Sequence, residues 1–229
     1  MAGQGTYDVD IVLCIDGTGS MSHIIEEVKT NAMSLYEKFE QAMILAGKEP
    51  AGSRVKVVVF GDYECDPEPM RQSEFFNLPE QNEAFRSYVQ GIRENGGGDI
   101  PENAFEAIIT AMKSEWKEPQ PGKKRRQAIV VFSDAPALAL GARSSCPGYP
   151  TDIPKTMAEL SAWWEGTSQE FGSRYDPIAG RLVAFVPNDE SWTQLESWNR
   201  FTPMYTAGRG CSDIDMQIIL DTVVGSFDK

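Results

Sequence analysis

The sequence predicts an α/β fold in which helices cover both faces of a doubly wound, mostly parallel central sheet of about six strands, including one antiparallel edge strand. Short apolar runs rich in β-branched residues, typical of strands buried on both faces, occur at 9–16, 54–60, 127–134 and 181–186. Between them lie segments with apolar residues at every third or fourth position, a spacing typical of helices packed on a core. This alternation of strand and helix patterns predicts the fold class.

The remaining elements follow from the same patterns and from glycine and proline positions. A single helix is predicted from residue 24 to about Gly47, where glycine favours a helix end. Residues 72–78 alternate weakly, which favours a short edge strand. Further predicted elements are helices at 81–94, 101–112 and 157–164, a short helix at 192–198, a short strand at 204–206, and a closing helix at 213–227 with Asp213 as its N-cap.

The length and the charge limit the domain organisation and the classes of partner. The 229 residues fit one large domain, expected over 7–229, with 1–6 as a short N-terminal extension. Lys and Arg number 21 against 34 Asp and Glu, so this acidic protein has a formal charge of -13. That charge repels phosphate backbones and anionic lipid, which argues against nucleic acid or membrane as a partner. Because no signal sequence or long apolar stretch is visible, a cytoplasmic location is expected.

Two of the predicted strands end in a carboxylate. Asp16 ends the first strand and Asp134 ends the strand at 127–134, so both side chains are expected at the carboxyl edge of the sheet, where ligands collect in such folds. The turn after Asp16 places the hydroxyls of Thr18 and Ser20 two and four residues later. Hard oxygen donors of this kind suit a divalent cation, with Mg²⁺ favoured and Mn²⁺ and Ca²⁺ as close competitors. A simple turn with a helix cap is the alternative interpretation.

The D-x-T-x-S pattern after an apolar strand resembles the metal-ion-dependent adhesion site (MIDAS) of von Willebrand factor type A (vWA) domains. The resemblance implies a vWA or Rossmann-like fold over nearly the whole chain, in a stand-alone intracellular member of bacterial type. In the family, a glycine-rich loop ends in a metal-binding Thr, and that position resembles Asp99 after Gly96, Gly97 and Gly98. The resemblance implies the metal ligands Asp16, Thr18, Ser20, Asp99 and Asp134.

The carboxylate at position 99 departs from the family pattern. One interpretation makes Asp99 a metal ligand, and the other makes it an N-cap of the helix that begins near Pro101. If Asp16, Asp99 and Asp134 surround one divalent ion, three negative charges face two positive charges. We then expect tighter metal binding and weaker capture of acidic ligands than in the adhesion members.

Other residues near the same edge have less specific interpretations. Asp62 and Glu64 follow the second strand and either orient a ligand or metal-bound water, or form a solvated acidic loop. His23 is interpreted as a surface histidine that lies close to a ligand at best. The basic residues at 123–126 are predicted to form a solvated turn. Of the adjacent pair Trp163 and Trp164, one is expected to lie outside the core.

Two function classes follow. The first is a metal-binding protein-interaction module, acting as an intracellular scaffold or regulatory subunit whose partner at the metal-site rim is an ATPase, kinase or phosphatase. It is not expected to be an enzyme, because the sequence has no nucleophile elbow and no phosphate-binding glycine motif. The alternative is a Mg²⁺-dependent phosphotransferase or hydrolase, since IDGTGS resembles the loop of haloacid-dehalogenase-type enzymes. That register places Cys14 where the aspartate nucleophile belongs.

Overall fold

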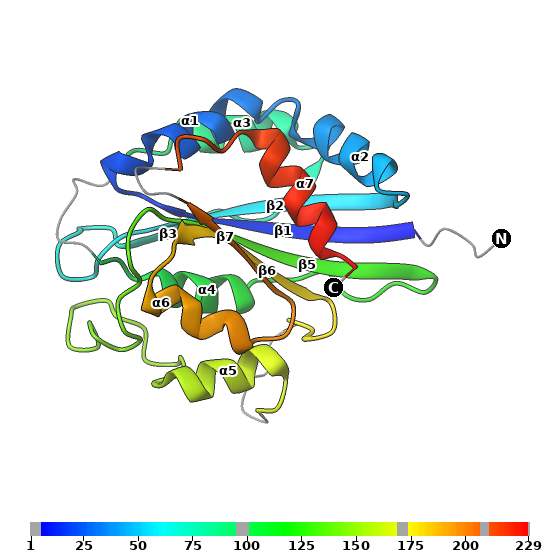
Figure 1. Cartoon of the computed structure of the whole chain (residues 1–229). Coiled ribbons are helices and arrows are strands. Elements are labelled where there is room, and N and C mark those ends of the chain that lie inside the picture. Colours follow the sequence, from blue (N-terminus) through cyan, green and yellow to red (C-terminus); the bar gives the residue numbers. More distant parts are fainter. Residues whose placement is uncertain (1–5, 95–100, 169–173, 207–210, 229) are drawn as a thin grey trace.

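The computed structural model describes residues 6–94, 101–168, 174–206 and 211–228, which form a central sheet with helices on both faces (Figure 1). The strands are β1 (Thr6–Asp16), β2 (Glu49–Phe60), β3 (Met70–Gln72), β4 (Phe76–Leu78), β5 (Lys123–Phe132), β6 (Gly180–Pro187) and β7 (Phe201–Thr206). The helices are α1 (Ser22–Asn31), α2 (Leu35–Leu45), α3 (Asn82–Gln90), α4 (Ala104–Met112), α5 (Met157–Glu165), α6 (Glu190–Thr193) and α7 (Met216–Ser226). Among these residues, no helix has the length and apolar character needed to cross a membrane.

The sheet confirms the predicted class. Its order is β3-β2-β1-β5-β6-β7, and β1 lies at the centre with parallel neighbours β2 and β5. The antiparallel edge is interrupted, because β3 pairs with residues 58–60 of β2 and β4 pairs with residues 53–55. Within the described residues the sheet therefore has seven strands, against about six predicted, since one expected edge strand is present as two short pieces.

The helices form two layers that bury opposite faces of the sheet. Helices α1, α2, α3 and α7 cover one face, and α4, α5 and α6 cover the other (Figure 1). Alternate residues of β1 point to opposite layers: Leu13 and Ile15 pack in the cluster with α1 and α7, whereas Val12 and Cys14 pack in the cluster with α4. Burial on both faces explains why this strand is apolar throughout.

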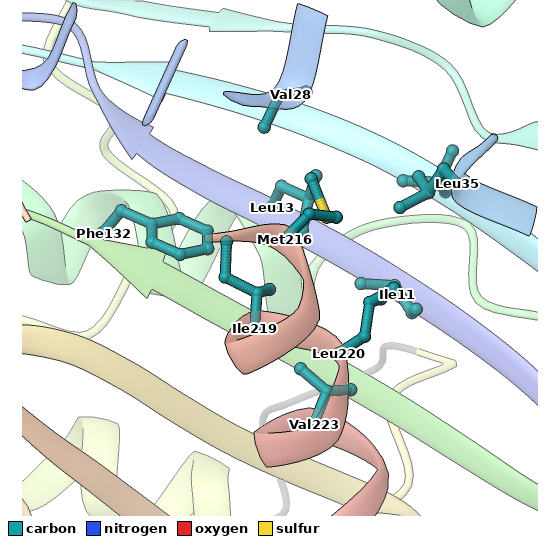
Figure 2. A pocket seen from close by; sticks show the side chains of 10 residues that line it. Ile11, Leu13, Val28, Leu35, Phe132, Met216, Ile219, Leu220 and Val223 are labelled. Carbon is teal, nitrogen blue, oxygen red and sulfur yellow. The ribbon is translucent and has the colours of Figure 1, made fainter. Parts of the chain in front are cut away.

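Helix α7 packs along β1 and β5 through an apolar seam (Figure 2). Its Met216, Ile219, Leu220 and Val223 face side chains of both strands and enclose a cavity of about 20 Å³. A cavity of this size holds one water at most, and its walls are entirely apolar, so it is expected to be dry. The seam fixes the helix on the layer that also carries α1, which follows the Asp16 turn.

Three predicted helices differ at their ends or in their continuity. The first is broken into α1 and α2, because the Asn31 amide donates to the Glu27 carbonyl oxygen at 2.8 Å and competes with the backbone ladder. Helix α4 begins at Ala104, since Glu102 forms an isolated parallel bridge with Ala137 instead of starting a helix. The N-cap of α7 is Asp215, whose carboxylate accepts from the Ile218 N–H at 2.9 Å.

The basic residues at 123–126 are not a solvated turn but the first part of β5. Lys123 pairs with Asp8 at 3.4 Å, and Arg126 donates to the Phe227 carbonyl oxygen. Arg125 forms an ion pair with Asp176, and Lys124 and Arg126 lie over the Tyr7 ring, so each basic residue has a contact in the sheet. The tryptophan pair divides as expected, because Trp164 is fully buried and Trp163 is only partly buried.

Candidate metal centre

The turn after β1 is built around the Asp16 carboxylate. The Thr18 N–H and hydroxyl both donate to Asp16 Oδ1, at 3.0 and 2.7 Å, which closes an Asx turn. The Gly17 N–H donates to the Phe60 carbonyl oxygen at 2.7 Å and ties the turn to the end of β2. The sequence DGTGS therefore folds the hydroxyls back toward the strand-terminal carboxylate.

A second carboxylate reaches this turn from the end of β5. The parallel register pairs Ile15 of β1 with Phe132 of β5, so the residues that follow these two strands also lie side by side. The Ser133 hydroxyl donates to Asp16 Oδ2 at 2.8 Å, and the Ser20 hydroxyl donates to Asp134 Oδ1 at 2.9 Å. Four of the predicted ligands, which come from two stretches of chain, thus lie together: Asp16, Thr18, Ser20 and Asp134.

The hydroxyl oxygens of Thr18 and Ser20 lie close to each other in this turn. Thr18 Oγ1 and Ser20 Oγ lie 3.1 Å apart, and each has one hydrogen, which the shorter contacts to Asp16 and Asp134 use. Their lone pairs are therefore left for another donor or for a cation. Neighbouring ligands of an octahedral ion with bonds of about 2.1 Å lie roughly 3.0 Å apart. The observed spacing fits that geometry.

The centre runs from a buried floor to an exposed rim. Asp16 has no exposed surface, Thr18 is half-buried and Ser20 is exposed. Burial raises the pKa of Asp16; hydrogen bonds from Thr18 and Ser133 oppose this effect, and the charge of nearby Asp134 adds to it. A buried carboxylate beside a second one favours a cation, because a positive charge would stabilise both ionised forms.

Glu102 is a neighbour of this centre that the sequence did not reveal. Its backbone lies against the loop after β5, since its N–H donates to the Pro136 carbonyl oxygen and its own carbonyl accepts from the Leu138 N–H at 2.8 Å. The side chain is 1% exposed, and Oε2 has no hydrogen-bond partner among the described residues. Burial and then the charge of Asp16 raise the pKa of Glu102 to about 8. The only sequence signal was a Glu after Pro101, which resembles an ordinary first helical turn.

Asp62 and Glu64 lie at the same edge but bind an arginine. Arg143 Nε donates to Asp62 Oδ1 at 2.7 Å and Nη2 donates to Oδ2 at 2.5 Å, while Nη1 forms an ion pair with Glu64. Burial by itself would raise the pKa of Asp62, but the hydrogen bonds from Arg143 and from the Glu64 N–H lower it overall. Asp62 is buried in this ion pair, whereas Glu64 is exposed, and the predicted role of both in orienting a ligand or a metal-bound water stays a prediction. Arg143 lies in the loop between β5 and α5, and no sequence motif indicated its role.

Asp99 lies outside the described residues. Before this gap, Glu94 Oε1 accepts from the Ser22 hydroxyl at 2.6 Å. After it, Glu102, the second described residue, lies near Asp16. His23 Nε2 lies 3.0 Å from the Ile214 carbonyl oxygen, which connects α1 to the segment before α7. His23 therefore has a structural partner instead of a ligand.

The donor set is oxygen only. Among the described parts of the chain, no group of three or more His, Cys, Asp or Glu side chains is arranged to hold a metal ion. The candidate centre combines two carboxylates with two hydroxyls instead. Cys14 is fully buried, and burial raises the pKa of its thiol well above the usual range, so it is not available as a nucleophile. The phosphotransferase alternative has no support at this residue.

Replacing Ser133 with Ala tests the support of Asp16. The variant removes the 2.8 Å hydrogen bond to Oδ2 of a carboxylate with no exposed surface. We expect a loss of about 1–2 kcal/mol in the free energy of unfolding, because a buried acceptor loses its partner. Chemical denaturation monitored by circular dichroism measures the change. Ser197→Ala is the control, because the exposed Ser197 hydroxyl donates to the Gln194 carbonyl oxygen, away from the Asp16 turn. It should change the free energy of unfolding by less than about 0.5 kcal/mol.

Comparisons with known proteins agree with this fold. The chain is 25% identical over 146 residues to "Alpha-protein kinase vwkA" of Dictyostelium discoideum, covering 64% of this chain and 21% of that protein. Among solved structures, proximal thread matrix protein 1 from the mussel byssus matches with a TM-score of 0.54 and 13% identity, covering 97% of this chain and 49% of that one. The pilus adhesin SpaC from Lactobacillus rhamnosus GG matches with a TM-score of 0.54 and 12% identity, covering 98% and 31%.

A von Willebrand factor type A structure from Catenulispora acidiphila matches with a TM-score of 0.51 and 11% identity, covering 96% of this chain and 43% of that one. The chain spans about a fifth of the curated relative and less than half of each structure. At these identities the structural matches establish the fold alone. The family model "von Willebrand factor type A domain" matches residues 10–161, which is more than half of the sequence. The chain belongs to the von Willebrand factor type A domain family.

Proposed function

We propose that the chain is a divalent-metal-binding interaction module, which holds one ion in a MIDAS-type site and presents the rim of that site to a protein partner. Asp16, Thr18, Ser20 and Asp134 are the proposed ligands, with Mg²⁺ as the favoured ion and Mn²⁺ and Ca²⁺ as competitors. The observation that carries the proposal is the 3.1 Å approach of the Thr18 and Ser20 hydroxyl oxygens, which also lie 2.7 Å from Asp16 Oδ1 and 2.9 Å from Asp134 Oδ1, respectively.

The surrounding residues fit a cation in three respects. Two carboxylates lie on one hydrogen-bonded chain, and the pKa of buried Asp16 is raised by burial and by Asp134. The orphaned Oε2 of Glu102 supplies a further buried acceptor near Asp16. When bound, the ion would supply a positive charge whose solvent-facing positions are filled by water or by a partner's oxygen atom.

Asp99 is proposed as an additional ligand. Glu94 and Glu102, on either side of the segment that contains it, lie next to the turn, which supports this assignment. With Asp99, three carboxylates would face one divalent ion, so the negative charge around the centre would exceed the charge of the ion. The rim is therefore proposed to favour a neutral or basic partner surface over an acidic one.

The partner is proposed to be an ATPase, a kinase or a phosphatase, in an intracellular scaffold or regulatory role at a cytoplasmic location. The relative from Dictyostelium is named as a protein kinase, which is consistent with a kinase among these classes. Exposure of Ser20 at the rim, with Thr18 half-buried behind it, leaves the centre accessible to a docking protein.

Calorimetric titration of the metal-free chain tests the site. We expect one Mg²⁺ per chain for the unchanged protein and no measurable binding for Asp134→Ala, which removes one of the three proposed carboxylate ligands. Asp221→Asn is the matched control, because Asp221 is exposed on α7 and accepts from the Gln217 side-chain amide. Equal Mg²⁺ affinity in Asp134→Ala and in the unchanged protein would contradict the proposed centre.

The partner role is tested separately by affinity capture from native extract. The capture is performed in about 2 mM Mg²⁺, because this hard ion keeps its water and binds proteins weakly. A partner docked through the ion would be retained under these conditions, released by EDTA and absent when Ser20→Ala is used. Retention that is identical with and without EDTA would contradict a metal-dependent rim. A binding partner whose docking surface is strongly acidic would contradict the charge argument.

A further inference from the structure

A cavity of about 480 Å³ lies within the long loop that connects β5 to α5, and we call it the loop cavity because residues 140–155 supply its walls. Leu140, Ile153 and Pro154 form an apolar wall, and the first two also pack against the core cluster that contains α4. Thr151 and Lys155 are exposed, so the cavity is open to solvent on their side. A space of this volume accepts a small organic molecule.

A buried carboxylate of α4 is bonded to the wall of the loop cavity. Glu106 is 1% exposed, and its Oε1 accepts from the Tyr149 hydroxyl at 2.5 Å and from the Gly141 N–H at 3.3 Å. Both donors belong to residues that line the cavity. Glu106 Oε2 has no hydrogen-bond partner among the described residues, and Lys113, at the end of the same helix, pairs with Asp152 instead. A buried carboxylate without a cation is unfavourable, so this one lacks a positive charge.

Tyr149 connects the charge of Glu106 to the cavity. The Tyr149 hydroxyl has one hydrogen, which it donates to Glu106, so its oxygen can only accept from a ligand. Burial, this hydrogen bond and the charge of Glu106 raise the pKa of Tyr149, which keeps the hydroxyl protonated. The Tyr63 ring packs edge to face on the Tyr149 ring, with centroids 5.1 Å apart, and fixes its position. Lys155 also lines the cavity, but water screens its exposed charge more than that of buried Glu106.

We propose that the loop cavity binds a primary alkylammonium group. The ammonium donates to the Tyr149 oxygen beside Glu106, and the alkyl chain contacts the apolar wall at Leu140 and Ile153. A charged donor at this position strengthens the hydrogen bond and offsets the buried negative charge. A free amine and the lysine side chain of a partner share this chemistry. The inference does not depend on the proposed function, because no residue of the loop cavity is a proposed metal ligand.

Titration with n-butylammonium in EDTA tests the site without a contribution from the metal centre. We expect saturable shifts of the Gly141 and Thr151 amide NMR signals, with a dissociation constant of about 1 mM. Glu106→Gln removes the charge, keeps an acceptor for Tyr149 and should weaken binding at least about 10-fold. Tyr149→Phe keeps the ring, removes the accepting oxygen and should weaken binding by a similar factor. Asp221→Asn, which removes an exposed carboxylate on α7, is the matched control for net charge and should leave the affinity unchanged.

Analogues of the probe show which part of the ligand is recognised. 1-Butanol lacks the charge and butyltrimethylammonium lacks the N–H hydrogens, so each should bind at least about 10-fold more weakly than n-butylammonium. Equal affinity for either analogue overturns the inference, as does a folded Glu106→Gln chain that binds n-butylammonium as tightly as the unchanged chain. If circular dichroism shows that Glu106→Gln is unfolded, Tyr149→Phe decides by the same criterion.

A final comparison distinguishes the two sources of the amine. Nα-acetyl-lysine N-methylamide presents the same ammonium on a peptide backbone. If it binds as tightly as n-butylammonium, the cavity accepts a lysine of a partner, and if it binds more weakly, the ligand is a free amine. Both results support the site, whereas the absence of Gly141 and Thr151 shifts with every amine overturns it.

Discussion

Asp16→Asn is expected to abolish Mg²⁺ binding while leaving the metal-free protein more stable than before. The side chain has no exposed surface, and burial raises the pKa of Asp16, so its ionised form is costly without a cation. Asn keeps the carbonyl oxygen that accepts from the Thr18 N–H and hydroxyl. Its amide group can donate to the Ser133 oxygen where Asp16 Oδ2 now accepts. The substitution therefore removes the charge and preserves the turn.

The two effects have opposite signs, which makes the result specific. We expect Mg²⁺ affinity to fall at least about 100-fold, because the one fully buried anionic ligand is lost. The metal-free variant should gain roughly 1 kcal/mol, or about 2–4 °C in Tm for a chain of this size. A residue with a merely structural role would lose stability in both states.

Thermal unfolding in EDTA and in 5 mM Mg²⁺ measures both quantities, since a ligand that binds only the folded state raises Tm. The unchanged chain should show a Mg²⁺-dependent rise that Asp16→Asn lacks. Asp221→Asn, exposed on α7, should keep the rise. A variant that is less stable than the unchanged protein in EDTA, with the same Mg²⁺ response, would show that Asp16 serves the turn alone.

The residues of the centre that could be predicted from the sequence are those that lie at, or directly after, the ends of predicted strands. Asp16 and Asp134 each end an apolar run, and parallel strands bring their carboxyl ends to one edge, so their meeting follows from fold class and position. Thr18 and Ser20 follow because the turn is only four residues long. Local pattern and sheet topology together were sufficient for these four residues.

The functional residues that the sequence did not reveal contact partners far away along the chain, and such contacts leave no repeating pattern in the local sequence. Arg143 lies 81 residues from Asp62, in a loop whose path no motif fixes. Glu102 is buried because its backbone forms a bridge with Ala137, and an isolated bridge leaves no alternation in the sequence. Ser133 precedes Asp134 and looked like one more strand residue, although its hydroxyl reaches Asp16.

Some predicted helix and strand ends differ from the observed ends for a related reason. Side-chain contacts, which the local pattern does not show, determine where the element begins or stops. The Asn31 amide takes the Glu27 carbonyl oxygen, so a continuous apolar stripe is interrupted without glycine or proline. The basic residues at the start of β5 enter the sheet because partners elsewhere in the chain pair with two of them, Asp8 with Lys123 and Asp176 with Arg125. Neither partner can be identified from the local sequence.

Glu102→Gln is expected to change how the stability of the metal-free protein depends on pH. Burial and the neighbouring Asp16, Asp66 and Asp62 raise the pKa of Glu102 from the ordinary 4.5 to about 8. The unfolded chain therefore loses this proton at lower pH than the folded chain. The neutral side chain stabilises the folded state fully below about pH 4.5, and this contribution is lost as pH rises to about 8.

The size of the effect is set by the separation between these two pKa values. It corresponds to at most about 5 kcal/mol, and we expect half of that or less because water and neighbouring groups relax around the ionised carboxylate. Glu102→Gln lacks the titration, so its stability relative to the unchanged protein should rise steadily between pH 5 and about 8.5, beyond the upper pKa. Chemical denaturation in EDTA at closely spaced pH values measures the difference.

Glu118→Gln is the control for this series, because Glu118 is exposed and pairs with exposed Arg174. Its difference from the unchanged protein should stay within about 0.5 kcal/mol at every pH. A Glu102→Gln difference that is equally flat would mean that the folded protein ionises Glu102 at its ordinary pKa. Glu102 would then not be the destabilised buried carboxyl that its position beside Asp16 predicts.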